Sequence, residues 1–384
     1  MRNTMLWTAL CAALAFGCEK AQLNPVEEEE PAREPVVLLE DVARVLARVP
    51  LGSEQLEEVY DAAYSSAGNG YDEEYRMKEL FANPGSGVGG SQTKAEGYSK
   101  PLRELLREAV RATRADGGPD DPDAWLDALS ASDVQIYWPF SDSWNGDSFP
   151  VITFDPGGDV PQNEGYAVGA DGKVTKVLVT EQMAREQPVW VVNRNSDADY
   201  KTLEMLRRED PSWGQGGGDI VVSKATADTR TLVLRSFKAR RQFDSWFAGA
   251  SEFWVKIGSI EDFHASTEGE LRLYEPTITD FVVVVRRGQV GEFVPFNAVL
   301  VSDWTSQLES CALMIIEDDG GTQTTWKCSA TVKYESKAYG IDLELPLRTR
   351  DDIVWRGNLA RGFVEKNNGH TISLGDVQLV LELI

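Results

Sequence analysis

The chain has 384 residues, which is enough for two to three domains at about 150 residues each. Hydrophobic residues make up 42% of the sequence and charged residues 26%, a composition that excludes a mostly disordered or fibrous chain. Acidic residues number 62 and basic residues 38, which gives a formal net charge of −24. Such a surface repels phosphate groups, so we expect no nucleic-acid partner.

The N-terminus has the pattern of an export signal with a lipid anchor. Arg2 precedes an apolar run, residues 5–16, that is too short to span a bilayer as a helix. The sequence LAFGC at residues 14–18 resembles the lipobox of bacterial lipoproteins. This resemblance implies a signal peptide over residues 1–17 and a lipid on Cys18. An ordinary secretory signal is the alternative.

Residues 18–35 have the composition of an acidic tether. Four consecutive glutamates, residues 27–30, lie among three prolines, so charge repulsion and proline geometry favour an extended chain. No later segment is apolar for long enough to cross a bilayer, so we expect the membrane as a partner only through the lipid anchor. The expected location is extracytoplasmic, at the periplasmic or the surface face of the outer membrane.

The hydrophobic pattern changes from helical to strand-like near residue 131. Before that point, apolar residues recur at spacings of three and four, which predicts helices at 36–47, 55–64, 72–81 and 102–112. Short apolar runs between turn residues follow from Val134 onward, and they predict antiparallel strands. We therefore expect a mainly β protein with an N-terminal α region. The predicted parts are a helical region at 36–130, a β-rich domain at 131–245 and a β-sandwich domain at 246–384.

Two short motifs carry a resemblance to known proteins. The sequences NGYDEEY at residues 69–75 and YWPF at residues 137–140 resemble uncharacterised Gram-negative bacterial lipoproteins. The stretch from Leu313 onward is similar to calcium-associated C2-like sandwiches. The regular spacing of the short strands predicts an antiparallel β-sandwich, C2-like or immunoglobulin-like, in the C-terminal portion. Neither resemblance implies an activity.

Two cysteines, Cys311 and Cys328, remain once the signal and the lipidated residue are set aside. The segment between them has the pattern of a β-hairpin with Asp319-Gly320 at its turn. In that register the cysteines lie opposite each other as a non-hydrogen-bonded pair, whose Cα spacing of about 4.5 Å suits a disulfide. We expect a Cys311–Cys328 disulfide, with two free buried cysteines as the alternative.

Residues 193–204 have the spacing of a 12-residue calcium loop. Oxygen-bearing side chains alternate along its first half, and an acidic residue stands at the last position, where such loops place a bidentate ligand. A polar loop that caps the following helix is the alternative. The predicted ligands of this candidate calcium site are Asn193, Asn195, Asp197, Asp199 and Glu204.

The 11 tryptophans suggest sugar binding as well as core packing, because aromatic faces stack on sugars. Trp144 and Trp213 lie in polar, glycine-containing loops and are the candidate ligand-binding residues.

We assign no catalytic residue, because the chain has only two histidines and no nucleophile-elbow motif. The sequence favours a non-catalytic binding or envelope-structural role, associated with carbohydrate or calcium, with a glycan or an envelope protein as partner. Two alternatives stay open: a carboxylate-dependent glycoside hydrolase and a subunit of a surface assembly. The hydrolase would need two carboxylates facing each other across a cleft, and the subunit a long exposed edge strand or apolar patch.

Overall fold

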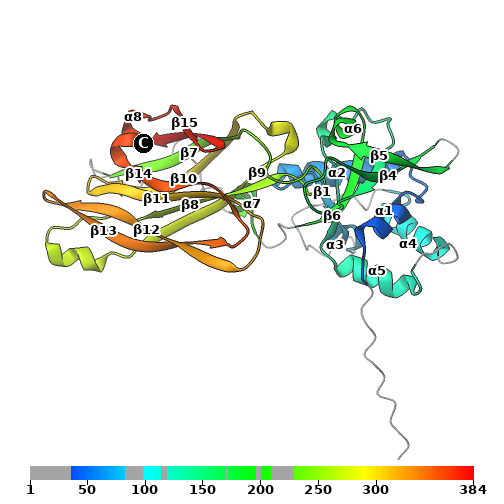
Figure 1. Ribbon diagram of the computed structural model, residues 1–384, viewed down its shortest axis with the longest axis horizontal. Coiled ribbons are helices and arrows are strands. Elements are labelled where there is room, and N and C mark those ends of the chain that lie inside the picture. The colour runs from blue at the N-terminus through cyan, green and yellow to red at the C-terminus, as the bar shows by residue number, and fades with distance from the viewer. Residues whose placement is uncertain (1–35, 83–97, 114–118, 170–171, 196–199, 210–228) are drawn as a thin grey trace, which may run out of the picture. The chain divides into compact units, whose positions relative to one another are not determined.

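The computed structural model describes residues 36–82, 98–113, 119–169, 172–195, 200–209 and 229–384. These residues form a mainly β protein with helices near the N-terminus and antiparallel sheets in the C-terminal part, so the predicted fold class is confirmed (Figure 1). The described α-helices are α1 (Leu39–Leu46), α2 (Ser53–Gly68), α3 (Met77–Phe81), α4 (Leu102–Ala112), α5 (Pro122–Ala131), α6 (Glu181–Glu186), α7 (Leu203–Glu209) and α8 (Arg361–Lys366).

The first sheet has six strands in the order β1-β2-β6-β3-β4-β5. Strands β3 and β6 run parallel, and the other neighbours run antiparallel. Its strands are β1 (Glu74–Arg76), β2 (Val134–Tyr137), β3 (Val151–Phe154), β4 (Gln162–Val168), β5 (Val174–Thr180) and β6 (Val189–Arg194).

The N-terminal helices bury their apolar stripes in the same core as this sheet. In α4 the buried residues recur at helical spacing, as in Leu102, Leu105 and Leu106, because one face of an amphipathic helix turns inward. Those leucines share a hydrophobic cluster with Ile136 of β2 and Trp190 of β6. Helices and sheet therefore share one core from Val37 to Val192, which crosses the predicted division at residue 130.

The predicted helix at residues 72–81 is correct only in its second half. Residues Glu74–Arg76 form strand β1, and α3 begins at Met77. The three strand residues pair with β2 between Tyr137 and Gln135. This pairing to a distant strand overrides the local helical spacing.

The C-terminal part consists of two antiparallel sheets that share one hydrophobic core. One sheet has the order β10-β7-β16-β15, and the other has the order β13-β12-β11-β8-β9, with β14 also paired to β11. Their strands are β7 (Thr229–Ala239), β8 (Ser251–Ser259), β9 (Thr277–Val285), β10 (Val294–Thr305), β11 (Leu308–Glu317), β12 (Gln323–Tyr334), β13 (Lys337–Arg348), β14 (Asp352–Ala360), β15 (Thr371–Leu374) and β16 (Val377–Leu383).

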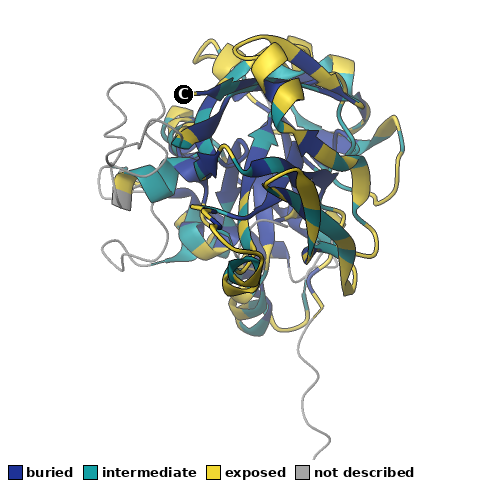
Figure 2. Ribbon diagram, turned by 90° about the vertical axis from the view of Figure 1, so that its left-hand side faces the viewer, coloured by how far each residue is buried: buried dark blue, intermediate teal, exposed yellow. Residues whose placement is uncertain are grey.

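Aromatic and aliphatic side chains from both C-terminal sheets meet between them. Phe237 of β7 and Phe253 of β8 lie with ring centroids 5.2 Å apart, and Leu313 of β11 belongs to the same cluster. Buried residues concentrate on the central strands, and exposed residues on outer strands and loops (Figure 2). This arrangement is a β-sandwich, in which two sheet faces remove their apolar residues from water together.

The loop between β7 and β8 inserts side chains into the core of the first sheet. Trp246 and Phe247 are buried beside Tyr137 and Val191. The Asn193 side chain on β6 donates hydrogen bonds to the Phe247 carbonyl at 3.0 Å and to the next carbonyl at 2.6 Å. The loop is therefore fixed at both its side chains and its backbone.

Candidate functional site

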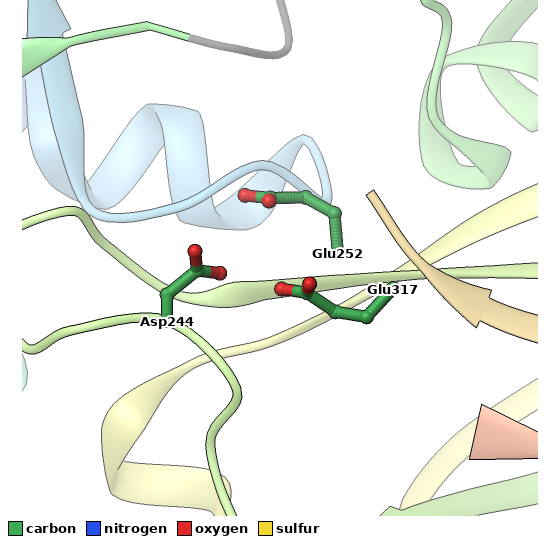
Figure 3. Close-up of side chains that lie close together, drawn as sticks. All are labelled: Asp244, Glu252 and Glu317. Carbon is green, nitrogen blue, oxygen red and sulfur yellow. The ribbon is translucent and has the colours of Figure 1, made fainter. Parts of the chain in front are cut away.

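Three acidic side chains meet where β8 begins and β11 ends. Asp244 lies in the loop before β8, Glu252 is the second residue of β8, and Glu317 is the last residue of β11. One carboxylate oxygen from each of the three lies within 4.8 Å of the others. Figure 3 shows the three carboxyl groups pointing toward one another.

Backbone hydrogen bonds hold Asp244 in place. The Ser251 hydroxyl oxygen accepts a hydrogen bond from the Phe243 amide at 2.8 Å, and this draws the loop onto the start of β8. From the other side, the buried Arg287 guanidinium donates to the Asp244 carbonyl at 2.7 Å and to the Gly249 carbonyl at 3.2 Å. The loop thus presents the Asp244 side chain to the cluster from a fixed backbone.

Strand alternation places Glu317 on the face of β11 opposite Ile316, and both faces of this strand are buried. Successive side chains of a strand point to opposite faces, so Glu317 follows Leu313 and Ile315 on one face of β11. Its neighbours across the sheet are Phe253 of β8 and Asp352 of β14. The Glu317 residue has 0% exposure to solvent, which is unusual for an acidic residue.

The buried carboxyl group of Glu317 is not satisfied by hydrogen-bond donors. Neither of its oxygens makes a hydrogen bond of normal geometry with any residue that the structure describes, and the same holds for Oδ2 of Asp244. The Asp244 and Glu317 carboxyl groups lie close enough to share a proton with each other. A buried polar group without a partner costs about 1–3 kcal/mol, and more when it is charged. A positively charged species between these carboxyl groups would remove that cost.

Burial and the closeness of the two carboxyl groups both affect the pKa values of Glu317 and Asp244. Burial, followed by the adjacent Asp244 carboxyl, raises the pKa of Glu317 well above its usual range. Burial also raises the pKa of Asp244, although Arg287 acts to lower it. Two carboxyl groups this close cannot both ionise without a counterion. Near neutral pH the pair therefore holds either a proton or a cation.

The distances suit a single hard cation. Calcium binds six to eight oxygens at about 2.3–2.6 Å, so two oxygens on one ion lie at most about 5 Å apart. The spacing of no more than 4.8 Å within the cluster meets that requirement. A glycoside hydrolase needs an accessible carboxylate pair about 5–10 Å apart, and the full burial of Glu317 does not provide one here.

The structure describes only part of the predicted calcium loop, residues 193–195 and 200–204. Asn193 is buried on β6 and donates to the loop before β8, and the Asn195 amide donates to Glu74 and to Gln135, each at 3.0 Å. Glu204 lies on α7 against Gly70, where an added Cβ would come within 2.1 Å of a Glu204 oxygen. The other two predicted ligands, Asp197 and Asp199, lie outside the described residues, so this site stays a prediction.

Of the two predicted sugar-binding tryptophans, the structure describes only Trp144, and its ring is packed among other aromatic side chains. Trp144 is half-buried, and its ring packs against Tyr60 and Trp138 at centroid distances of 5.2 and 5.3 Å. Its indole nitrogen donates to the Ser148 carbonyl at 3.1 Å. Trp213 lies outside the described part of the chain, as does the predicted lipidation site Cys18.

The predicted disulfide is wrong, because Cys311 and Cys328 are both free. Strand β11 pairs with β12 only near its start, at Leu308 and Ser310. Beyond that point it pairs with β14, where Cys311 lies opposite Leu359, and Cys328 of β12 lies opposite Leu343 of β13. The local hairpin pattern was overridden by pairing with a strand that comes later in the chain.

Comparisons with family models, curated proteins and solved structures find no match to this chain. None of the helices in the described residues is long and apolar enough to cross a membrane.

No sequence pattern identified Asp244, Glu252 and Glu317 as a group. Glu317 ends an apolar strand, which marks it as a candidate for burial, but its two partners lie more than 60 residues earlier in the chain. Only the pairing of β8 with β11 brings them together.

Proposed function

We propose that this protein is a non-catalytic, lipid-anchored envelope protein whose C-terminal sandwich binds a divalent cation, calcium in preference to magnesium. The observation that carries the cation site is Glu317, an acidic side chain with no exposure to solvent and no normal hydrogen bond, directed at two further carboxyl groups. Three carboxylates that come from a loop and two strand ends suit the adaptable coordination of calcium better than the strict octahedron of magnesium.

Calorimetric titration with calcium chloride tests the cation site. We expect the wild type to bind and Glu317→Gln to bind at least tenfold more weakly, because the amide keeps the shape of the side chain but loses the charge. The matched control is Glu309→Gln, a partly exposed glutamate on the same strand that pairs with Lys333. Equal heats for the wild type and Glu317→Gln, or no heat for the wild type, would contradict the proposal.

The same titration at several pH values tests the exchange of a proton for the cation. Because the folded protein raises the pKa of Glu317, calcium must displace a proton, so its affinity should increase with pH. In a chelator, Glu317→Gln should be at least as stable as the wild type, since glutamine needs no proton to be neutral. Calcium should raise the melting temperature of the wild type only.

The lipid anchor rests on the resemblance of residues 14–18 to a lipobox and on the acidic tether that follows. Two or more acyl chains on one residue would hold the protein firmly at a membrane, since each buried methylene contributes about 0.8 kcal/mol. We expect Cys18→Ser to move the protein from the membrane fraction to the soluble extracytoplasmic fraction. A variant that stays membrane-bound would contradict the anchor and leave the cation site untouched.

A further inference from the structure

A second site lies on the other side of β11 from Glu317. It is a pocket of about 440 Å³. It is formed by β8, the end of β11, the start of β12, the end of β13 and the loop that follows β13. Trp254 and Lys256 of β8 line it together with Ile316 and Asp318, which flank Glu317 in sequence. A volume of this order is typical of small-molecule sites.

The polar groups of this pocket are balanced between donors and acceptors. Lys256 and Arg348 supply cationic donors, Asp318 and Asp351 supply anionic acceptors, and Gln323 supplies both kinds of group. Because both charges and several polar groups line the pocket, it does not suit a simple anion, a simple cation or a purely apolar ligand. A molecule rich in hydroxyl groups, each of which donates and accepts, matches it.

The aromatic wall of the pocket is held in one orientation. The Trp254 indole nitrogen donates to the Asp318 carboxylate at 3.2 Å, and the Lys256 ammonium lies 4.5 Å from the centroid of the Trp254 ring. The Tyr200 ring packs edge-on against Trp254, with a centroid distance of 5.8 Å. A wall fixed in this way loses little entropy when a ligand binds, which favours affinity.

One acceptor in the lining is left without a normal partner. Oδ2 of Asp351 accepts a hydrogen bond from the Arg348 amide at 2.6 Å, whereas Oδ1 is buried and makes none of normal geometry. The Arg348 side chain donates to Asp318 at 3.2 Å, so acids and base form a connected rim. A hydroxyl donor from a bound ligand would satisfy Oδ1, since a buried acceptor without a hydrogen bond is energetically unfavourable.

We propose that this pocket binds a neutral saccharide unit, with Asp318, Asp351, Arg348 and Gln323 binding its hydroxyl groups and Trp254 contacting its C–H face. The proposal does not rest on the cation site, because Glu317 faces away from the pocket. It differs from the sugar site predicted at Trp144 and Trp213, because it uses a tryptophan that lies on a strand among convergent polar groups.

Saturation-transfer NMR and calorimetry with five hexoses test the proposal. The probes are the neutral sugars glucose, galactose and mannose, and the charged analogues glucuronate and glucosamine. We expect at least one neutral hexose to bind the wild type and to bind more tightly than either charged analogue. Binding should fall at least tenfold in Asp351→Asn and in Arg348→Gln. The control Asp376→Asn, at a partly exposed aspartate between β15 and β16 that pairs with Arg241, should bind like the wild type.

Three results would overturn the proposal: no binding of any neutral hexose, a preference for a charged analogue, or binding that survives in both Asp351→Asn and Arg348→Gln. Melting temperatures near the wild-type value would show that the variants are folded. Glu317→Gln separates the two sites, because it should lose calcium binding and keep sugar binding.

Discussion

At the scale of single residues, buried acids are the recurring feature, and Glu73 is the best defined. It lies in the motif at residues 69–75, and its side chain accepts hydrogen bonds from Phe140, the last residue of the motif at 137–140, and from Ser141, which follows that motif directly. The Ser141 amide and hydroxyl each bind Oε1 at 2.9 Å, and the Phe140 amide binds Oε2 at 3.2 Å. Phe140 has a left-handed backbone, with φ of 61°, which is rare for a bulky residue. The two motifs are therefore one structural unit.

Glu73 should make stability depend on pH. Burial, with a further contribution from Asp72, raises its pKa from 4.5 to about 7. The folded state binds this proton more tightly than the unfolded state, so the stabilisation is fully present below pH 4.5 and is lost as pH rises through 7. Protonated Glu73 therefore contributes about 3 kcal/mol to the free energy of unfolding at low pH, relative to its contribution at high pH.

Glu73→Gln removes this titration, so its unfolding free energy should fall less steeply than that of the wild type between pH 5 and about 7.5. Urea unfolding across that range measures the slope. The control is Glu186→Gln at the exposed end of α6. If Glu73→Gln and the wild type have the same slope, another group carries the dependence.

At the scale of elements, β11 shows what the sequence could and could not predict. Its apolar run and the turn after it identified a strand correctly, as did the spacing of Leu102 to Ala112 for a helix. The partner of the strand was misassigned, because a hairpin was the nearest pairing compatible with the pattern. Burial on both faces removes the alternation that would fix a register, and β14 lies some 40 residues further along the chain.

The pairing of β11 with β14 predicts free thiols at Cys311 and Cys328. Burial raises the pKa of both, well above the usual range for Cys311 and to about 11 for Cys328, so little reactive thiolate forms at neutral pH. Alkylation of the native protein without reductant should label Cys328 slowly and Cys311 only after denaturation, as peptide mass mapping would show. Recovery of a disulfide-linked pair of peptides that contain Cys311 and Cys328 would contradict the β11–β14 pairing and support the predicted hairpin.

At the scale of the whole molecule, the net charge of −24 dominates. Like charges on a compact chain repel one another, and salt shortens the range of that repulsion from about 30 Å at 10 mM to about 8 Å at 150 mM. We expect the melting temperature to rise with sodium chloride over this range in the wild type and equally in Glu317→Gln. Calcium at micromolar to millimolar concentration should add a further increase only in the wild type. A melting temperature that falls with sodium chloride would show that ion pairs outweigh the repulsion.

The loop between β7 and β8 has a consequence for how the chain can be divided. Trp246 and Phe247 fill the core beside Tyr137, while Asp244, two residues earlier, belongs to the carboxyl cluster of the sandwich. Truncation at the predicted boundary, residue 245, would leave a cavity in the core of the first fragment. It would expose the rings of Trp246 and Phe247 on the second fragment. The parts on either side of residue 245 are therefore expected to unfold together, and a cavity-forming change at Phe247 is expected to weaken calcium binding at the carboxyl cluster as well as stability.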